Sequence, residues 1–192
     1  MTPRTKRQLN VAARKRTKIP AEALTPAEYE RLLAAAKAHS PRLYAMVLLA
    51  RNHGLRASEV CALRPEHVTG NGTVITLYRR KGSRPGTHPL TAEEQAALAP
   101  FLEAPGTLFV IHRTQFYNLY RGIAQASGLP PSKQGPHSLK HTCAKLALNG
   151  GAPIAAVQQF VGWRSLNSMQ RYLKYSDEEA SALCLPTAGV KK

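Results

Sequence analysis

Residues 136–151 read PHSLKHTCAKLALNGG, and this stretch predicts a helix that begins with polar and charged side chains. We expect the helix to run from Ser138 to Asn149, because the two glycines that follow favour the backbone conformations that end a helix. His137 and Lys140 are three residues apart and should share one helical face. The pair suits an anionic partner, since imidazole can carry a proton and the ammonium group carries a charge.

Further helices are predicted on both sides of this stretch. Two capping boxes, TPAE at 25–28 and TAEE at 91–94, predict helices that end near Ala38 and Glu103. Additional helices are expected over residues 40–54, 57–63, 114–127, 153–161, 167–172 and 177–183.

One region predicts strands. Residues 73–78 are β-branched and apolar, 82–86 form a turn, and 87–90 can pair back. The expected fold class is therefore mainly α with a small antiparallel β-sheet (α+β). A chain of 192 residues fits one domain with a sizeable core.

Four more residues continue the chemistry of the opening stretch. In chain order they are Arg56, Lys81, Trp163 and Tyr172, within or directly after the phrases GLRASE, RKG, VGW and MQR. A phosphodiester resists attack because it is already anionic and gathers more charge in the transition state, and fixed cations stabilise that charge. Together with His137 and Lys140, the set can hold a phosphodiester and attack it with tyrosine.

The order and wording of these phrases resemble the catalytic domain of the tyrosine recombinases, or phage integrase family, over roughly residues 22 to 185. Within this family, the chain resembles the short fimbrial-switch invertases, which share RASE, a Lys-Gly hairpin ending in THPL (here 87–90) and a QFY segment (here 115–117). The resemblance implies the tyrosine recombinase catalytic-domain fold. It also implies a site-specific DNA recombinase that cleaves and rejoins DNA through a 3′-phosphotyrosyl intermediate, in inversion, integration or excision, as a tetramer on DNA.

The resemblance also assigns roles. Tyr172 would be the nucleophile, and the remaining catalytic residues would be Arg56, Lys81, His137, Lys140 and Trp163. Glu59 would support Arg56 without acting as a catalyst. Lys81 would protonate the leaving 5′-oxygen, a task unsuited to its arginine neighbours because a guanidinium holds its proton too tightly.

Lys140 departs from the family pattern, and Tyr172 has a neighbouring tyrosine that could compete for its role. Lys140 stands where the family usually has arginine, so it keeps the charge but lacks a two-pronged grip on phosphate. We expect activity to survive, because the other five positions fit the pattern. Tyr175 lies close to Tyr172, but the spacing from Trp163 favours Tyr172 as the nucleophile.

The net charge of +16 indicates a polyanionic partner, and we expect double-stranded DNA. We expect residues 1–20 to form a basic flexible arm, residues 21–185 to form the catalytic domain and residues 186–192 to form a C-terminal tail. Expected DNA contacts from the arm and from the neighbourhood of Lys81 are Arg4, Lys6, Arg7, Arg14, Lys15, Arg16, Lys18, Arg79, Arg80 and Arg84.

Other classes fit the sequence poorly. The three cysteines are odd in number and widely spaced, which suits reduced thiols in the cytoplasm. The longest apolar run, 43–50, is too short to cross a membrane. His137 and His141 have a metal-ligand spacing, but Ser138 stands where the zinc motif needs glutamate. We therefore expect no metal, no cofactor, no membrane partner and no small-molecule substrate.

Two alternatives remain open. A type IB topoisomerase-like nicking-closing enzyme would use the same chemistry without a specific site. A catalytically impaired DNA-binding regulator would keep the DNA surface without cleavage, and Lys140 in place of arginine is the feature that motivates it.

Overall fold

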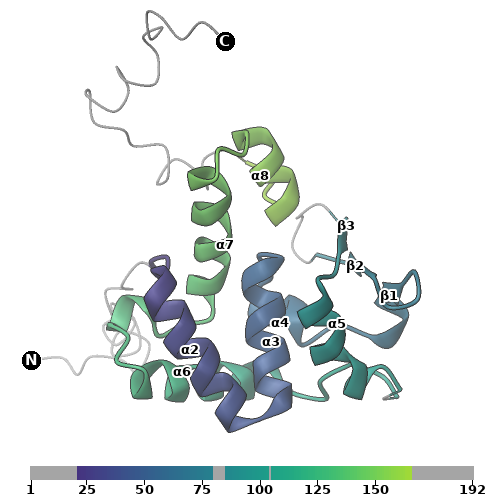
Figure 1. Cartoon of the computed structure of the whole chain (residues 1–192), viewed down its shortest axis with the longest axis horizontal. Helices are drawn as coiled ribbons and strands as arrows, with labels where there is room; N and C mark the ends of the chain where they lie inside the picture. The colour runs from purple at the N-terminus through teal and green to yellow at the C-terminus, as the bar shows by residue number, and fades with distance from the viewer. Residues whose placement is uncertain (1–20, 80–84, 104, 166–192) are drawn as a thin grey trace, which may run out of the picture.

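The computed structural model describes residues 21–79, 85–103 and 105–165. Its central element is α3 (Pro41–Asn52), an apolar helix that packs against α2 (Pro26–His39) on one side and α5 (Ala92–Leu98) on another (Figure 1). Helix α6 (Arg113–Ala126) lies along the same group of helices. Figure 1 shows how α7 (His137–Asn149) leads away from them to α8 (Ile154–Val161). The remaining short helices are α4 (Ala57–Val60) and the 3₁₀ turns at Pro65–His67, Ala99–Phe101 and Pro131–Lys133.

Local capping fixes where the first helices begin. Thr25 and Glu28 form the predicted capping box, in which each side chain accepts a hydrogen bond from the other residue's backbone N–H. Ser40 starts α3 by accepting from the backbone N–H of Leu43. The box at Thr91 starts α5, but α5 ends at Leu98 and continues only as a 3₁₀ turn, short of the predicted end near Glu103. Pro100 explains the difference, since proline lacks the N–H that an α-helix needs and crowds the preceding turn.

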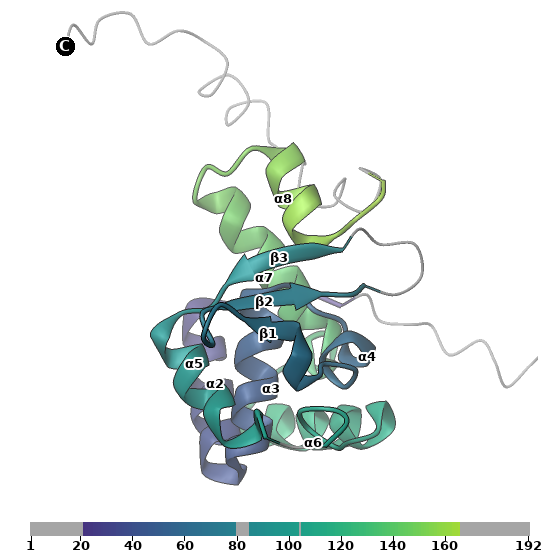
Figure 2. The same cartoon turned by 90° about the vertical axis from the view of Figure 1, so that its right-hand side faces the viewer.

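The sheet has three antiparallel strands in the order β1 (Val68–Thr69), β2 (Val74–Leu77) and β3 (Gly86–Pro89). Figure 2 shows the three strands side by side across the helices. Strands β2 and β3 confirm the predicted hairpin, with Ile75 opposite His88. The two-residue strand β1 was not predicted, because it is too short to show an alternating pattern.

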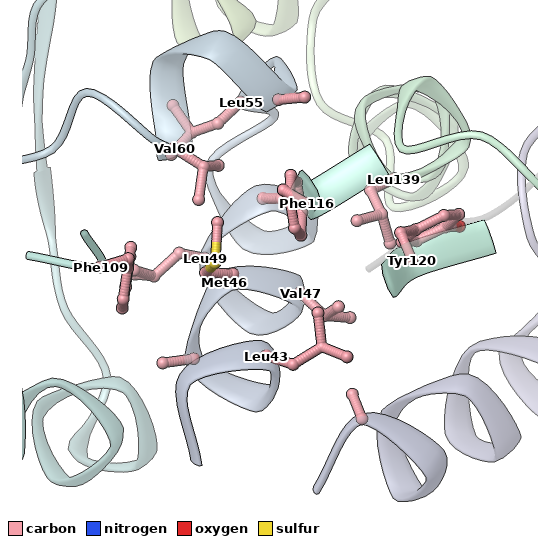
Figure 3. Close-up of a cluster of buried hydrophobic side chains, with 14 of the residues drawn as sticks. Leu43, Met46, Val47, Leu49, Leu55, Val60, Phe109, Phe116, Tyr120 and Leu139 are labelled. Atoms are coloured by element: carbon pink, nitrogen blue, oxygen red, sulfur yellow. The ribbon is translucent and has the colours of Figure 1, made fainter. Parts of the chain in front are cut away.

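The core forms around α3. Figure 3 shows side chains of α3, including Met46 and Leu49, close to Phe116 and Tyr120 of α6 and to Leu139 of α7. A smaller buried cluster joins α7 to α8 and includes Cys143, Val157, Val161 and Trp163. The predicted class, mainly helical with a small antiparallel sheet, is confirmed. The helices predicted over 167–172 and 177–183 lie outside the described residues.

Candidate active site

The turn that carries Arg56 depends on a glycine. Gly54 has a φ of 59°, in the left-handed region that favours glycine. A Cβ added there would lie 2.9 Å from Val161 Cγ1, so the position also needs the space. Gly54 thus ends α3 and lets the α3–α4 turn approach the end of α8.

Glu59 holds Arg56 from two directions. Its Oε2 accepts a hydrogen bond from Arg56 N at 2.8 Å, and its Oε1 pairs with Arg56 Nη1 at 2.7 Å. The Glu59 side chain is 2% exposed, whereas that of Arg56 is 31% exposed. Burial raises the pKa of Glu59, but the hydrogen bond from Arg56 N and the charge of Lys140 outweigh it, so the pKa lies below its ordinary value. Glu59 therefore makes the contacts that its expected supporting role requires.

Lys140 is buried on α7, at 4% exposure. Its Nζ donates a hydrogen bond to Val161 O at 2.7 Å and lies 5.7 Å from the centre of the Trp163 ring. Burial lowers the pKa of Lys140 to about 7, and the charges of Arg79 and Arg56 act in the same direction against Glu59. Lys140 is thus held beside Trp163 in a site where an added negative charge would favour its protonated form.

His137 begins α7, one turn before Lys140, and is exposed. Ser138, the next residue, fixes the start of α7. Ser138 Oγ donates to Gly135 O at 2.8 Å and hydrogen-bonds the hydroxyl of Tyr120 at 2.6 Å. Burial raises the pKa of Tyr120, which keeps this phenol neutral in the core. Tyr120 therefore positions the end of α7 that carries His137.

Arg79 corrects an expectation from the sequence. We expected it to contact DNA from the surface, but its side chain is only 1% exposed. The guanidinium donates to the backbone carbonyls of His53, Gly54 and Phe160 at 3.0, 3.2 and 2.7 Å. A basic residue within a run of basic residues is expected to be a surface charge, so no local pattern indicated that Arg79 is buried.

Sequence reasoning also missed a buried pair of histidines next to Arg79. His53 Nδ1 and His88 Nδ1 are 3.1 Å apart, and His53 Nε2 lies 2.9 Å from Glu94 Oε1. The His88 ring stacks on Phe160 of α8, with ring centres 4.0 Å apart. These contacts join β3 to the ends of α3 and α8. His88 belongs to the THPL phrase, but only its packing reveals this role.

The histidine pair predicts an acid-sensitive fold. Burial lowers the pKa of His88 to about 4, with the charges of His53 and Arg79 adding to the effect and Glu94 opposing it. Between pH 6.5 and pH 4, His88 is protonated in the unfolded chain but neutral in the folded protein. As the pH is lowered through this range, the free energy of unfolding should therefore fall by about 1 to 3 kcal/mol because of this residue. Urea unfolding of wild type and His88→Gln across this pH range measures it.

The curve for His88→Gln should be flatter than the wild-type curve, because glutamine can keep a hydrogen bond to His53 without titrating. His39→Gln is the matched control, since His39 is exposed. Parallel wild-type and His88→Gln curves would contradict the prediction.

Other expected site residues lie outside the described residues. They are Tyr172, Lys81, Arg80, Arg84 and the arm residues Arg4, Lys6, Arg7, Arg14, Lys15, Arg16 and Lys18. Within the described part of the chain, Arg56, Glu59, Lys140 and Trp163 come together around the end of α8.

In residues 21–79, 85–103 and 105–165, no group of three histidine, cysteine, aspartate or glutamate side chains is arranged to hold a metal ion. No helix in these residues is both long enough and apolar enough to span a membrane.

Comparison with known proteins identifies the family by sequence. The profile of the Phage integrase family matches residues 22–179. Type 1 fimbriae regulatory protein FimB of Escherichia coli (strain K12) is 31% identical over 159 residues, covering 74% of this chain and 79% of the relative. Tyrosine recombinase XerD of Xanthomonas campestris pv. campestris is also 31% identical, covering 79% of this chain and 54% of the relative.

Solved structures give the same fold. XerA recombinase has a TM-score of 0.71 at 24% identity, covering 94% of this chain and 68% of that one. The catalytic domain of bacteriophage HP1 integrase has a TM-score of 0.64 at 22% identity, covering 90% of this chain and 99% of that domain. XerH recombinase bound to its difH substrate has a TM-score of 0.71 at 21% identity, but this chain covers only 54% of it. The expected catalytic-domain fold is confirmed, and the chain belongs to the phage integrase family, the tyrosine recombinases.

Proposed function

We propose that this chain is a site-specific DNA recombinase that breaks and rejoins double-stranded DNA through a 3′-phosphotyrosyl intermediate. The observation that carries the proposal is a cluster of three cationic side chains around one carboxylate. Arg56, Arg79 and Lys140 each interact electrostatically with the carboxylate of Glu59. A site with this excess of positive charge favours an anionic ligand such as a phosphodiester.

Each residue has a distinct task in the proposed reaction. The Tyr172 hydroxyl attacks the scissile phosphorus, forms an O–P bond and releases the 5′-oxygen of the cleaved strand. His137 accepts the phenol proton, and Lys81 donates a proton to the leaving 5′-oxygen. Arg56, Lys140 and the Trp163 indole N–H stabilise the charge on the non-bridging oxygens.

The reaction is reversible without an energy source. When the 5′-hydroxyl of another strand attacks the phosphotyrosyl bond, it replaces Tyr172 and restores a phosphodiester. The number of ester bonds does not change, so the step needs no ATP. Exchange between two duplexes requires four cleavages, which is why we propose a tetramer on DNA. Similar folds have been solved on DNA, as in XerH with difH and the Tn1549 transposon integrase with transposon right-end DNA.

A two-site plasmid tests the proposed function. DNA flanking the gene should be sequenced for inverted repeats, and two copies of each candidate repeat placed on a supercoiled plasmid. Purified protein should invert or excise the intervening segment, which restriction digestion detects. Relaxation of a plasmid without any repeat would instead indicate a topoisomerase-like enzyme.

A catalytically impaired DNA-binding regulator is the second candidate. The observation in its favour is that Lys140 donates to Val161 O in a buried position, with its pKa lowered to about 7 by burial. An arginine would stay charged there and could still offer two parallel hydrogen bonds. Tight, specific binding to a repeat with no covalent adduct would support the regulator.

The basic arm should steepen the salt dependence of binding. Residues 1–20 carry seven lysine or arginine residues and no acidic residue. Deleting residues 2–18 should weaken DNA binding and lower the slope of log K against log salt by up to about 6, because each phosphate contact releases about 0.9 counterion. Fluorescence anisotropy from 50 to 300 mM salt measures the slope.

The control for the arm is a double substitution in the C-terminal tail, Lys191→Gln with Lys192→Gln, which removes charge from the other end of the chain. An unchanged slope in the arm deletion would mean that the arm is a solvated tail.

A further inference from the structure

Arg79 lies two residues beyond β2 and two residues before Lys81, and its side chain is almost fully buried. Its place in the chain is the base of the β2–β3 hairpin. A buried arginine is expensive unless its donors and its charge are matched, so its partners show what the burial achieves.

The guanidinium donates hydrogen bonds to the ends of two helices at once. Nη2 donates to Phe160 O in the last turn of α8 and to His53 O just beyond α3, and Nη1 donates to Gly54 O in the following turn. Carbonyls at helix C-termini have no partner within their own helix, and the helix dipole makes this end attractive to a cation. A planar group with five donors can satisfy both ends, which one ammonium group does less well.

These partners are neighbours of the catalytic residues. His53 and Gly54 directly precede the turn with Arg56, and Phe160 precedes Val161, whose carbonyl accepts from Lys140. Arg79 Nη1 also lies 3.7 Å from Glu59 Oε2, the carboxylate that holds Arg56. One side chain therefore connects the hairpin, the α3–α4 turn and the end of α8.

We propose that Arg79 is a positioning residue of the active site: its guanidinium fixes the chain just after β2 against the turn of Arg56 and the helix end beside Lys140 and Trp163. This inference rests on the proposed function. It differs from a DNA-contact role, because Arg79 would act through the residues it holds.

Arg79→Met tests the role, because it removes the charge and the donors but keeps the length of the side chain. Single-turnover cleavage of a bound suicide duplex should slow about a hundredfold, the scale for misplacing a reacting group. The affinity for duplex DNA should stay within about twofold. Arg79→Lys should recover part of the rate, because it restores the charge and some of the hydrogen bonds.

A pH profile separates positioning from plain loss of stability. Arg79 is one of the charges that lower the pKa of Lys140, after burial. Losing that charge should raise the pKa of Lys140, so any decline of the cleavage rate at alkaline pH should move to higher pH in Arg79→Met. General destabilisation would lower the rate without moving the profile. Arg64→Met is the matched control, because Arg64 is a half-exposed cation that pairs with Glu66.

Two outcomes would overturn the inference. The first is cleavage by Arg79→Met at the wild-type rate. The second is a weaker affinity and a salt slope lower by about 1 with normal cleavage of bound DNA, which is the result for a phosphate contact. If Arg79→Met does not fold, the same readouts on Arg79→Lys decide.

Hydrogen exchange keeps this test separate from the proposed function. If wild-type protein forms no adduct, the proposed function fails, and the positioning role is judged on the free protein. The amides of Leu55 and Trp163, which are hydrogen-bonded beside the Arg79 acceptors, should exchange at least about tenfold faster in Arg79→Met or Arg79→Lys. Unchanged exchange at both amides would overturn the role.

Discussion

Tyr172→Phe should abolish the covalent protein–DNA adduct and leave duplex affinity near the wild-type value. The substitution removes one oxygen atom, the proposed nucleophile, and leaves the aromatic ring. Loss of a nucleophile removes nearly all of the chemical step, so we expect a drop of at least about a thousandfold in adduct formation. The measurement uses a nicked suicide duplex, which traps the cleaved state, and a denaturing gel, on which only covalent complexes stay together.

Tyr175→Phe is the matched control for this prediction. Tyr175 is three residues further along the chain, carries the same phenol and should be dispensable. A phenol ionises near pH 10 in water, so the reactive tyrosine must be the one that reaches a cationic site. An adduct that persists in Tyr172→Phe and disappears in Tyr175→Phe would overturn the assignment.

Lys140→Ala should slow single-turnover cleavage by about a hundredfold or more, the usual scale for the loss of one transition-state donor. The duplex affinity should change little, because one phosphate contact among many contributes little to binding. Alanine also leaves space in the buried site, so Lys140→Met is needed as a second variant that fills the site without a charge. Both variants should be slow if the charge is what matters.

Lys140→Arg should match or exceed the wild-type rate, since a guanidinium adds a two-pronged grip on phosphate. The pKa of Lys140, lowered by burial to about 7, adds a pH dependence to this comparison. The charged form of Lys140 is present below this pKa and is lost as the pH rises through it, whereas arginine remains charged. The ratio of the Lys140→Arg rate to the wild-type rate should therefore rise between pH 6 and pH 9.

A bound DNA phosphate favours the charged form of Lys140 and so raises its pKa. With DNA bound, the rise in the rate ratio should therefore begin at a higher pH. The direction of the change stays the same. Equal rates for wild type and Lys140→Ala would make Lys140 a bystander. No cleavage by any variant, on a site that wild type binds, would favour the regulator.

The helix starts and the family were predictable from the sequence because their signals are local. Thr25 and Glu28 cap a helix three residues apart, and Gly54 ends another through its own backbone conformation. A capping box predicts only where a helix begins. The box at Thr91 therefore predicted the start of α5 but not its end, which Pro100 determines. The family resemblance assigned Glu59 to Arg56, and the two residues lie at the start of one short helix, with Arg56 as the N-cap of α4.

The tertiary structure decided which of the basic residues lie inside. Arg79 and Lys140 are both cations in the sequence, but their acceptors are distant in the chain: Arg79 binds carbonyls 25 to 81 residues away, and Lys140 binds one 21 residues away. Long-range contacts of this kind have no local pattern, because they arise only when α3, α7, α8 and the hairpin pack together. The sequence therefore determined the elements, the family and the order of the candidate catalytic residues. Only the packing turned Arg79 from an expected DNA contact into a buried link and paired His53 with His88. It also lowered the pKa of Lys140, because burial and nearby like charges depend on which groups the fold brings together.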